Sequence, residues 1–434
     1  MRDFSTSGLP FLRMVKRAPR IGSVCCAIGT LLVPLGAQER SADLSELLKD
    51  SVVKAALDAA RLTEQQTIED QIRFCEVPAP PFQERARGAM LRQAFEQQGL
   101  RPVRVDKAGN VIGERSGAFP RPRLVISAHL DTVFPEGTDV KVTRNGALLR
   151  GPGIGDDCRG LAVLVAIGRA MALAGVHTRG PVTFVATVGE EGLGDLRGVK
   201  QLFMETLAGE IDQFVSIDGT GLGVTNVAVG SLRYRMTFKG PGGHSYAAFG
   251  LANPISALGR AVAKIAELQV PAHPRTTFNV GRVGGGTSVN SIPSEAWMEI
   301  DLRSADPASL ESIDGKVMRA VDEAVSEENA RSRVPGIVTV VKERVGDRPA
   351  GSTAPGSSIV RTVEAVHRAL GLPISLGESS TDSNIPISLG IPAITIGTGG
   401  KGTGAHAPTE AFDTTDAWLG TQRAVFLTLA LSQK

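Results

Sequence analysis

Short apolar runs alternate with amphipathic segments through the first half of the chain. The runs at 123–131, 181–188 and 213–218 are largely apolar up to their last residues, which is typical of strands buried on both faces of a parallel sheet. Apolar residues at helical spacing predict one helix over 85–98 and another over 157–174. This alternation predicts an α/β fold in which a mostly parallel, doubly wound sheet is covered by helices on both faces.

The pattern changes near residue 227. From 227 to 346 the expected order is strand, helix, two strands, helix and strand, which is the ferredoxin-like βαββαβ arrangement. The Gly- and Pro-containing stretch 346–358 then predicts a linker. A helix expected at 359–370 and a strand expected at 392–400 return to the first pattern. The βαββαβ unit is therefore predicted to be inserted into the larger domain.

These patterns predict a signal peptide at 1–37, a catalytic domain in two parts at 42–226 and 347–434, and an inserted lid or dimerisation domain at 227–346. The apolar run "IGSVCCAIGTLLVPLGA" follows a basic segment and ends in small residues, as secretory signals do before their cleavage site. A retained anchor is the alternative, because the run is near the lower length limit for spanning a bilayer. We expect a secreted or periplasmic protein with no stable membrane span after cleavage.

Composition excludes several classes of protein. With 434 residues, 42% of them hydrophobic and 21% charged, the chain is long and apolar enough to bury a core and is not a disordered protein. Residues 1–37 hold five of the 47 Lys and Arg and one of the 45 Asp and Glu, so the formal charge without them is −2 rather than +2. The rest of the chain has no dense basic stripe, so no nucleic-acid partner is expected. Beyond the signal only Cys75 and Cys158 remain, either as two thiols or as one bridge.

Acidic and histidine residues follow the expected strands or begin the expected helix. They are His129, Asp131, Asp156, Glu190, Glu191, Asp218 and His406. In an open parallel sheet these ends line a common crevice, where so many carboxylates would repel one another unless cations lay among them. Imidazole and carboxylate ligands without thiolate favour zinc, with cobalt or manganese as alternatives. Asp131, two residues after His129, is expected to hold the imidazole so that its other nitrogen faces the metal.

The motifs "SAHLDTV", "GPGIGDD", "GEEG", "SIDG", "GPGGHS" and "GTGAHAPTE", in that order, resemble the M20 family of co-catalytic zinc peptidases and amidohydrolases over roughly residues 70 to 430. The resemblance implies that Asp156 bridges two zinc ions through its carboxylate. It implies that His129 and Asp218 complete one metal site, and that Glu191 and His406 complete the other. It further implies that Glu190 is the general base and that the peptide between Asp156 and Asp157 is cis.

The resemblance also carries roles into the inserted domain. His244 matches a histidine that reaches across a homodimer to the partner's site and stabilises the oxyanion, which implies dimerisation through 227–346. Asn290 and Arg303 match positions that hold substrate in relatives, and Arg303 would grip a carboxylate with two donors.

The predicted function is therefore that of an exported, homodimeric, dizinc exopeptidase that hydrolyses short peptides. The first alternative is an N-acyl amino acid amidohydrolase with the same metal site and a different pocket. The second is a metal-retaining binding protein without catalysis, which would have no need of a general base at Glu190.

Overall fold

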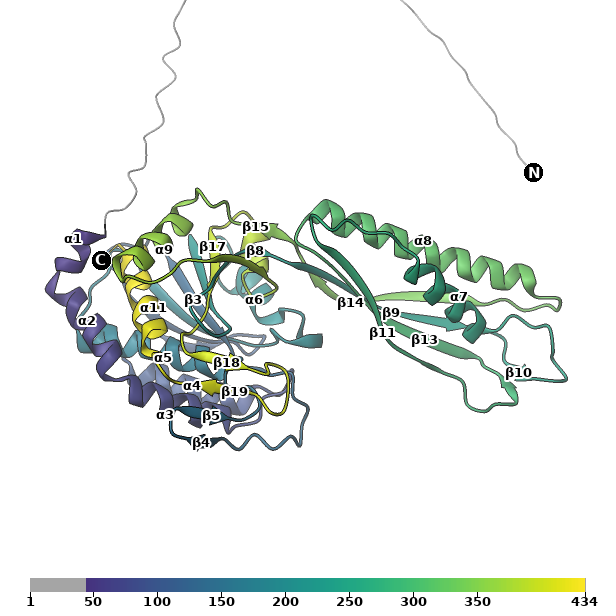
Figure 1. Cartoon of the computed structure of the whole chain (residues 1–434), viewed down its shortest axis with the longest axis horizontal. Helices are drawn as coiled ribbons and strands as arrows, with labels where there is room; N and C mark the ends of the chain where they lie inside the picture. Colours follow the sequence, from purple (N-terminus) through teal and green to yellow (C-terminus); the bar gives the residue numbers. More distant parts are fainter. Residues whose placement is uncertain (1–43, 434) are drawn as a thin grey trace, which may run out of the picture. The chain divides into compact units, whose positions relative to one another are not determined.

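The computed structural model describes residues 44–433 (Figure 1). The expected signal peptide at 1–37 lies outside the described residues, so its cleavage and the export it implies stay predictions. Among the helices of residues 44–433, none is both long and apolar enough to cross a membrane.

A nine-stranded sheet forms the centre of the larger domain. Its order is β1-β2-β6-β3-β7-β17-β8-β15, with β16 paired to β8. The strands are β1 (Val103–Val105), β2 (Val111–Arg115), β3 (Leu124–His129), β6 (Val182–Thr187), β7 (Gln213–Ile217), β8 (Val224–Ala228), β15 (Gly351–Ser352), β16 (Leu376–Ser379) and β17 (Ala393–Ile396). The adjacent strands β6, β3, β7 and β17 run parallel, whereas β1, β2 and β15 pair antiparallel at the edges. The predicted mostly parallel sheet is confirmed.

Helices cover both faces of this sheet. In β3, Leu124 and Ile126 belong to one hydrophobic cluster and Val125 to another, because successive side chains of a strand point to opposite faces. The larger cluster is built with α1 (Ser45–Lys49), α2 (Ser51–Leu62), α3 (Glu64–Cys75), α4 (Arg85–Gln97), α5 (Cys158–Leu173), α9 (Ser358–Ala369) and α11 (Trp418–Leu431). The smaller one is built with α6 (Arg197–Gln201), η2 (Leu202–Thr206) and α10 (Asn384–Ser388).

The inserted domain has the predicted βαββαβ order. Its strands are β9 (Gly230–Lys239), β11 (Thr276–Gly285), β13 (Glu295–Ser304) and β14 (Thr339–Arg348), in the antiparallel order β11-β13-β9-β14. The helices α7 (Pro254–Ala266) and α8 (Pro307–Arg331) lie on one face of this sheet (Figure 1). Apolar side chains alternate along β9 and β13 toward these helices and form a second core. Among residues 44–433, no helix covers the other face of this sheet.

The borders of the inserted sheet differ slightly from the expected ones. Residues 227–228 are the end of β8 and pair with the main sheet, so the inserted sheet begins at Gly230. At the other end, β14 continues to Arg348, three residues into the stretch that we predicted to be a linker. The Gly in "VGDRP" suggested the end of the strand, but there it accompanies a register shift between Arg344 and Gly346 in a strand that continues.

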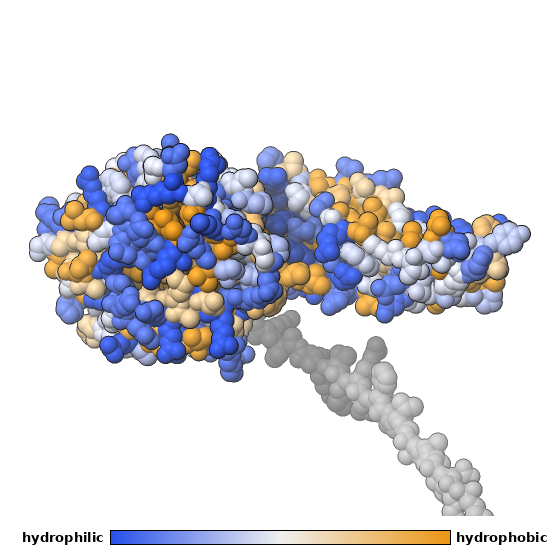
Figure 2. Space-filling model, turned by 90° about the horizontal axis from the view of Figure 1, so that it is seen from below, coloured by the Kyte–Doolittle hydropathy of each residue, from blue (hydrophilic) through white to orange (hydrophobic). Residues whose placement is uncertain are grey.

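Two smaller sheets position loops that the functional site uses. One is formed by β4 (Thr143–Asn145), β5 (Leu148–Arg150), β18 (Lys401–Thr403) and β19 (Ala411–Asp413). It brackets the loop 404–410, which carries His406. The other pairs β10 (Gly243–His244) with β12 (Ser291–Ile292) in the inserted domain. Elsewhere, Figure 2 shows hydrophobic residues scattered among hydrophilic ones over one face of the molecule.

Candidate metal centre and reaction pocket

The strand order of the main sheet explains why distant acids and histidines meet. His129 is the last residue of β3, the pair Glu190 and Glu191 follows β6, and Asp218 follows β7. Because β3 pairs in parallel with both β6 and β7, the carboxyl ends of all three strands lie at the same edge.

Asp156 lies between the two histidines. Its Oδ1 is 2.9 Å from His129 Nε2, and its Oδ2 is 3.1 Å from His406 Nε2. The same His406 nitrogen is 3.1 Å from Glu191 Oε1. Candidate ligand atoms of Asp156, Glu191 and His406 therefore lie within 4.8 Å of one another, as do those of His129 and Asp218. The structure brings together all five residues that the sequence predicted as metal ligands.

Asp157 joins the group formed by His129 and Asp218, but its carboxylate has other partners. One oxygen accepts a hydrogen bond from the backbone N–H of His129 at 2.9 Å, and the other accepts from Gly160 N at 3.1 Å as the N-cap of α5. Asp157 is thus a buried support of the site, which our sequence analysis missed. Its position at a helix start was the available signal.

Glu410 supports the segment that carries Asp156, and the sequence analysis missed it as well. Its buried carboxylate accepts hydrogen bonds from the backbone N–H groups of Gly153 at 2.9 Å, Gly155 at 2.7 Å and Asp156 at 3.0 Å. The peptide between Asp156 and Asp157 is cis, as the family resemblance implied. The sequence signal for Glu410 was its place as the last residue of the motif "GTGAHAPTE", to which we assigned no role.

Asp131 has a different role from the one expected. His129 Nδ1 is 3.0 Å from the main-chain oxygen of Asp131 and 3.7 Å from its carboxylate. The two carboxylate oxygens instead accept hydrogen bonds from the backbone N–H groups of Glu190 at 3.0 Å and Glu191 at 2.8 Å. Asp131 therefore orients the imidazole through its backbone and holds the two glutamates through its side chain.

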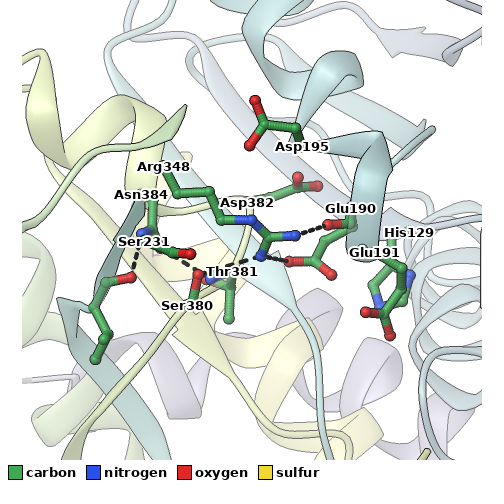
Figure 3. Close-up of polar contacts among 12 residues, drawn as sticks. His129, Glu190, Glu191, Asp195, Ser231, Arg348, Ser380, Thr381, Asp382 and Asn384 are labelled. Carbon is green, nitrogen blue, oxygen red and sulfur yellow. Dashed lines mark hydrogen bonds and ion pairs between the residues drawn. The ribbon is translucent and has the colours of Figure 1, made fainter. Parts of the chain in front are cut away.

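Glu190 is paired with an arginine that we placed in a linker. Arg348 Nη1 donates to Glu190 Oε1 at 3.1 Å and to Ser380 Oγ at 3.2 Å, while Nη2 donates to the main-chain oxygen of Glu190 (Figure 3). Both side chains are buried. Burial raises the pKa of the Glu190 carboxyl well above its usual value, the charge of Arg348 opposes this shift, and the charge of Glu191 adds to it.

The charges of the cluster are imperfectly balanced within the protein. Burial and the neighbouring charge of Asp156 raise the pKa of Asp218 to about 7. Hydrogen bonds to Asp156 and Glu191 raise the pKa of His406 to about 10. Burial alone would lower the pKa of His129, but nearby carboxylates outweigh it and raise that pKa well above the usual value. Divalent cations fit this set, because they would neutralise the carboxylates and accept both imidazole nitrogens.

A cavity of about 400 Å³ opens onto the cluster. Its lining residues are Val133, Asp156, Glu190, Glu191, Gly192, Asp218, Arg233, Arg303, Arg348, Ser379, Ser380 and His406. The structure therefore places the predicted substrate residue Arg303 beside the candidate metal ligands. It also adds two arginines, Arg233 and Arg348, that the sequence analysis did not select.

His244 and Asn290 lie together but not in this pocket. They line a separate cavity of about 600 Å³ in the inserted domain, and the two cavities share no residue. Their segments are joined by a hydrogen bond from Ser245 N to the Asn290 main-chain oxygen at 2.9 Å. His244 Nδ1 accepts from Tyr246 N at 3.2 Å, which leaves Nε2 to carry the ring proton as a donor.

The two cysteines of the described residues, Cys75 and Cys158, are buried free thiols, so the structure shows no bridge between them.

Comparison with known proteins agrees with this arrangement. Residues 228–329 match the family profile of the M20 peptidase dimerisation domain, and residues 110–263 match that of peptidase family M28. The chain is 28% identical to the succinyl-diaminopimelate desuccinylase of Leptothrix cholodnii, over 66% of this chain and 75% of that protein.

Two solved structures show the same fold. The aminopeptidase PepT of Bacillus cereus superposes with a TM-score of 0.68 at 20% identity, over 85% of this chain and 99% of that one. YxeP of Bacillus subtilis, described as a dinuclear metal-binding M20 peptidase, superposes with a TM-score of 0.64 at 15% identity, over 86% of this chain and 99% of that one.

Proposed function

Because the chain belongs to the M20 family of metallopeptidases and amidohydrolases and is a hydrolase of that type, we propose that it is a two-metal exopeptidase that cleaves amide bonds of short peptides. The observation that supports this most directly is the Asp156 carboxylate, which presents one oxygen to His129 and the other to His406. A carboxylate in that position suits a bridge between two cations.

In this proposal one ion would be held by His129, Asp156 and Asp218, and the other by Asp156, Glu191 and His406. Zinc suits the donor set of imidazole nitrogens and carboxylate oxygens, and cobalt or manganese would also fit. When bound, the ions would polarise the amide carbonyl and lower the pKa of the attacking water.

Glu190 is the proposed general base. Its carboxylate lines the reaction cavity and accepts a hydrogen bond from Arg348. Its candidate ligand atom lies within 4.8 Å of those of His129 and Glu191, which places it beside both proposed metal sites. It would accept the proton of the attacking water and then donate it to the leaving amine. Arg348 and Asp131 would hold its side chain and its backbone, respectively, in position for both transfers.

The arginines of the pocket suggest which end of a peptide enters it. Arg303 donates a hydrogen bond from Nε to the Asp301 carboxylate at 2.6 Å. Arg233 donates from Nη1 to the main-chain oxygen of Gly192 at 2.6 Å and from Nε to the Asp301 carboxylate at 3.3 Å. Both Nη groups of Arg303 have no hydrogen-bond partner among the described residues. These donors suit a substrate carboxylate, whereas a free α-ammonium would be repelled.

The same argument favours the alternative substrate class. An N-acyl amino acid has a carboxylate beside its amide bond and no α-ammonium, so it matches the arginines as well as the carboxyl end of a peptide does. The proposed function therefore retains an N-acyl amino acid amidohydrolase as its second candidate.

A substrate panel tests the proposal. Dipeptides and tripeptides with a free or an amidated carboxyl end, together with N-acetyl and N-succinyl amino acids, are incubated with the metal-replete protein, with and without EDTA. We expect chelator-sensitive hydrolysis that requires the free carboxylate, and the faster class identifies the enzyme as a peptidase or a deacylase. Absence of chelator-sensitive hydrolysis for every amide would contradict the proposal and favour a binding protein.

We also propose that the enzyme acts as a homodimer through the inserted domain. His244 and Asn290 line a cavity that contains none of the candidate metal ligands, so His244 would act on the site of a partner subunit. Apolar side chains near it are highly exposed in the single chain, including Tyr246, Phe249 and Val289. Such exposure is expected for surfaces that a partner covers.

A further inference from the structure

A second, smaller cavity adjoins the reaction pocket. It has a volume of about 240 Å³ and is lined by Val229, Arg275, Thr277, Arg303, Ala305 and Glu378. Arg303 lines both cavities, so the two cavities meet at this residue. A ligand bound near the candidate metal ligands can therefore extend past Arg303 into this second space.

The inserted sheet explains why two arginines meet there. In the pairing of β11 with β13, Thr277 lies directly opposite Arg303. Arg275 lies in the turn directly before β11 and lines the cavity together with Thr277 and Arg303, whose side chains share one face of the sheet. That face is the one opposite the helix-covered core, because the neighbouring residue Leu302 is buried in the core.

One arginine of this cavity, Arg275, has no charge partner among the described residues. Arg275 makes no hydrogen bond or ion pair with any described residue. Arg303 donates a hydrogen bond to Asp301 through Nε, and its two Nη groups donate to no described residue. Glu378 is the single acid in the lining, and it forms no ion pair within 4.0 Å with either arginine. Val229 and Ala305 add small apolar surfaces that suit one or two methylene groups. A carboxylate on a short alkyl chain matches both features.

We propose that this cavity is a subsite for a second carboxylate of the substrate, and that Arg275 is the residue that selects it. The substrate class is then a dicarboxylic one, either a peptide with an acidic side chain or an amino acid with a dicarboxylic acyl group. This inference rests on the proposed hydrolase function and specifies its substrate. Arg275 binds the distal carboxylate and takes no part in the chemical step.

Two matched substrate pairs test the subsite and distinguish its two sources. The first compares Ala-Glu with Ala-Gln, and the second compares N-succinyl-alanine with N-succinamoyl-alanine, which differs only by an amide in place of the distal carboxylate. For the protein with native Arg275, we expect kcat/KM to favour the acidic member of at least one pair about 10-fold or more, as a charge-assisted hydrogen bond would give. A preference in the first pair would show that the carboxylate belongs to an acidic side chain of a peptide. A preference in the second pair would show that it belongs to a dicarboxylic acyl group.

Three variants test the assignment to Arg275. Arg275→Gln is expected to reduce the preference to about threefold or less through KM, with little change in kcat. Glu378→Gln is expected to increase it, because it removes the only competing acid. Arg282→Gln is the matched control, since Arg282 lies on β11, the strand that begins directly after Arg275, but pairs with Glu299 outside both cavities and should leave the preference unchanged.

The outcomes distinguish failure of the subsite proposal from failure of the proposed function. No preference in either pair, or a preference that survives in Arg275→Gln, would overturn the subsite even if hydrolysis is chelator-sensitive. If no amide is hydrolysed, the proposed function fails, and calorimetric titration of the metal-replete protein with succinate and with succinamate decides the subsite instead. Tighter binding of succinate that is lost in Arg275→Gln would support it, and equal binding would contradict it.

Discussion

At the scale of single residues, His406 illustrates how the site depends on backbone geometry. Its φ of 65° lies in the left-handed region, which is uncommon for residues with a side chain. In that conformation its Nε2 reaches both Asp156 and Glu191. Glu190, one residue before Glu191, directs its carboxylate to Arg348 instead. Neighbouring glutamates thus have separate partners, which supports separate roles for them in metal binding and proton transfer.

Substitution of the proposed base separates these roles. We expect Glu190→Gln to keep two bound metal ions but to lose about 10²- to 10⁴-fold in kcat, because the amide cannot accept the proton of water. His406→Ala should instead lose one metal ion, since it removes a ligand. Metal content by elemental analysis and kcat on the same preparations test both expectations. Normal turnover in Glu190→Gln would show that the base is a different residue.

The protonation of the histidines predicts how metal affinity depends on pH. In the metal-free protein the pKa of His406 is raised to about 10 and that of His129 is raised above its usual value, so the neighbouring carboxylates favour the protonated form of both. Metal binds the neutral imidazole, so binding must release these protons. Affinity should therefore increase with pH up to about 10, by about tenfold per pH unit for each proton displaced.

Calorimetry in buffers with different ionisation enthalpies counts the released protons directly. A metal affinity that does not change between pH 6 and pH 9 would contradict this protonation of His129 and His406.

At the scale of elements, the site is held by polar contacts to loop backbones. Glu410, in the loop that follows β18, binds three backbone N–H groups of the segment before α5, and Asp157 binds the backbone of the last residue of β3. These contacts join segments that are far apart in sequence. Because a buried N–H group without a partner costs about 1–3 kcal/mol, such acceptors are structural requirements of the site.

Glu410→Ala should therefore weaken the site without removing a ligand. We expect a lower melting temperature and faster loss of metal to a chelator, because the N–H groups of Gly153, Gly155 and Asp156 lose their acceptor. Glu311→Ala, at an exposed acid on α8, is the control and should change neither quantity. Metal release in Glu410→Ala at the rate of the unsubstituted protein would refute a supporting role for Glu410.

Several elements could be recognised from the sequence because their pattern is local. The strands that became β3, β6 and β7 were predicted because apolar runs of that length are typical of buried strands. The helices of the inserted domain were predicted from apolar residues at helical spacing. We did not predict α11, which is apolar around most of its surface because it is buried, so it has no amphipathic period to detect.

At the scale of the whole molecule, the arrangement of two cavities predicts that each active site combines residues of two subunits. The candidate metal ligands and Glu190 line one cavity, while His244 lines another in the inserted domain. In the proposed homodimer each site would combine Glu190 of one subunit with His244 of the other. Two inactive variants should therefore restore activity when they are combined in one dimer, whereas a site formed by one chain alone would not allow this.

Glu190→Gln and His244→Ala homodimers should each be nearly inactive, with metal retained in both. Co-expression of the two variants should restore activity to about a quarter of the unsubstituted level, because half of the dimers are mixed and each mixed dimer has one intact site. Activity assays on the co-expressed protein, with sedimentation to confirm the dimer, test this. No recovery in confirmed mixed dimers would place His244 in the site of its own chain.

The proposed ligands were predictable because their chemistry and their position after strands are properties of the chain itself. His129, Asp156, Glu191, Asp218 and His406 have the residue types that bind zinc, and parallel strands bring their ends to one edge. Residue type and local periodicity indicated the group of candidates, since neither depends on which distant segments become neighbours. The choice of these five as ligands rested on the resemblance to the M20 family.

Arg348, Glu410 and Arg275 could not be assigned in this way. Each is an ordinary charged residue in its local sequence, and its importance comes from what folding places beside it: Glu190, the loop before α5, and the cavity behind Arg303, respectively. The division between Asp131's backbone and side-chain contacts likewise became visible only in three dimensions. Hydrogen bonds and cavities depend on distances between atoms, and only the packing of remote segments sets those distances.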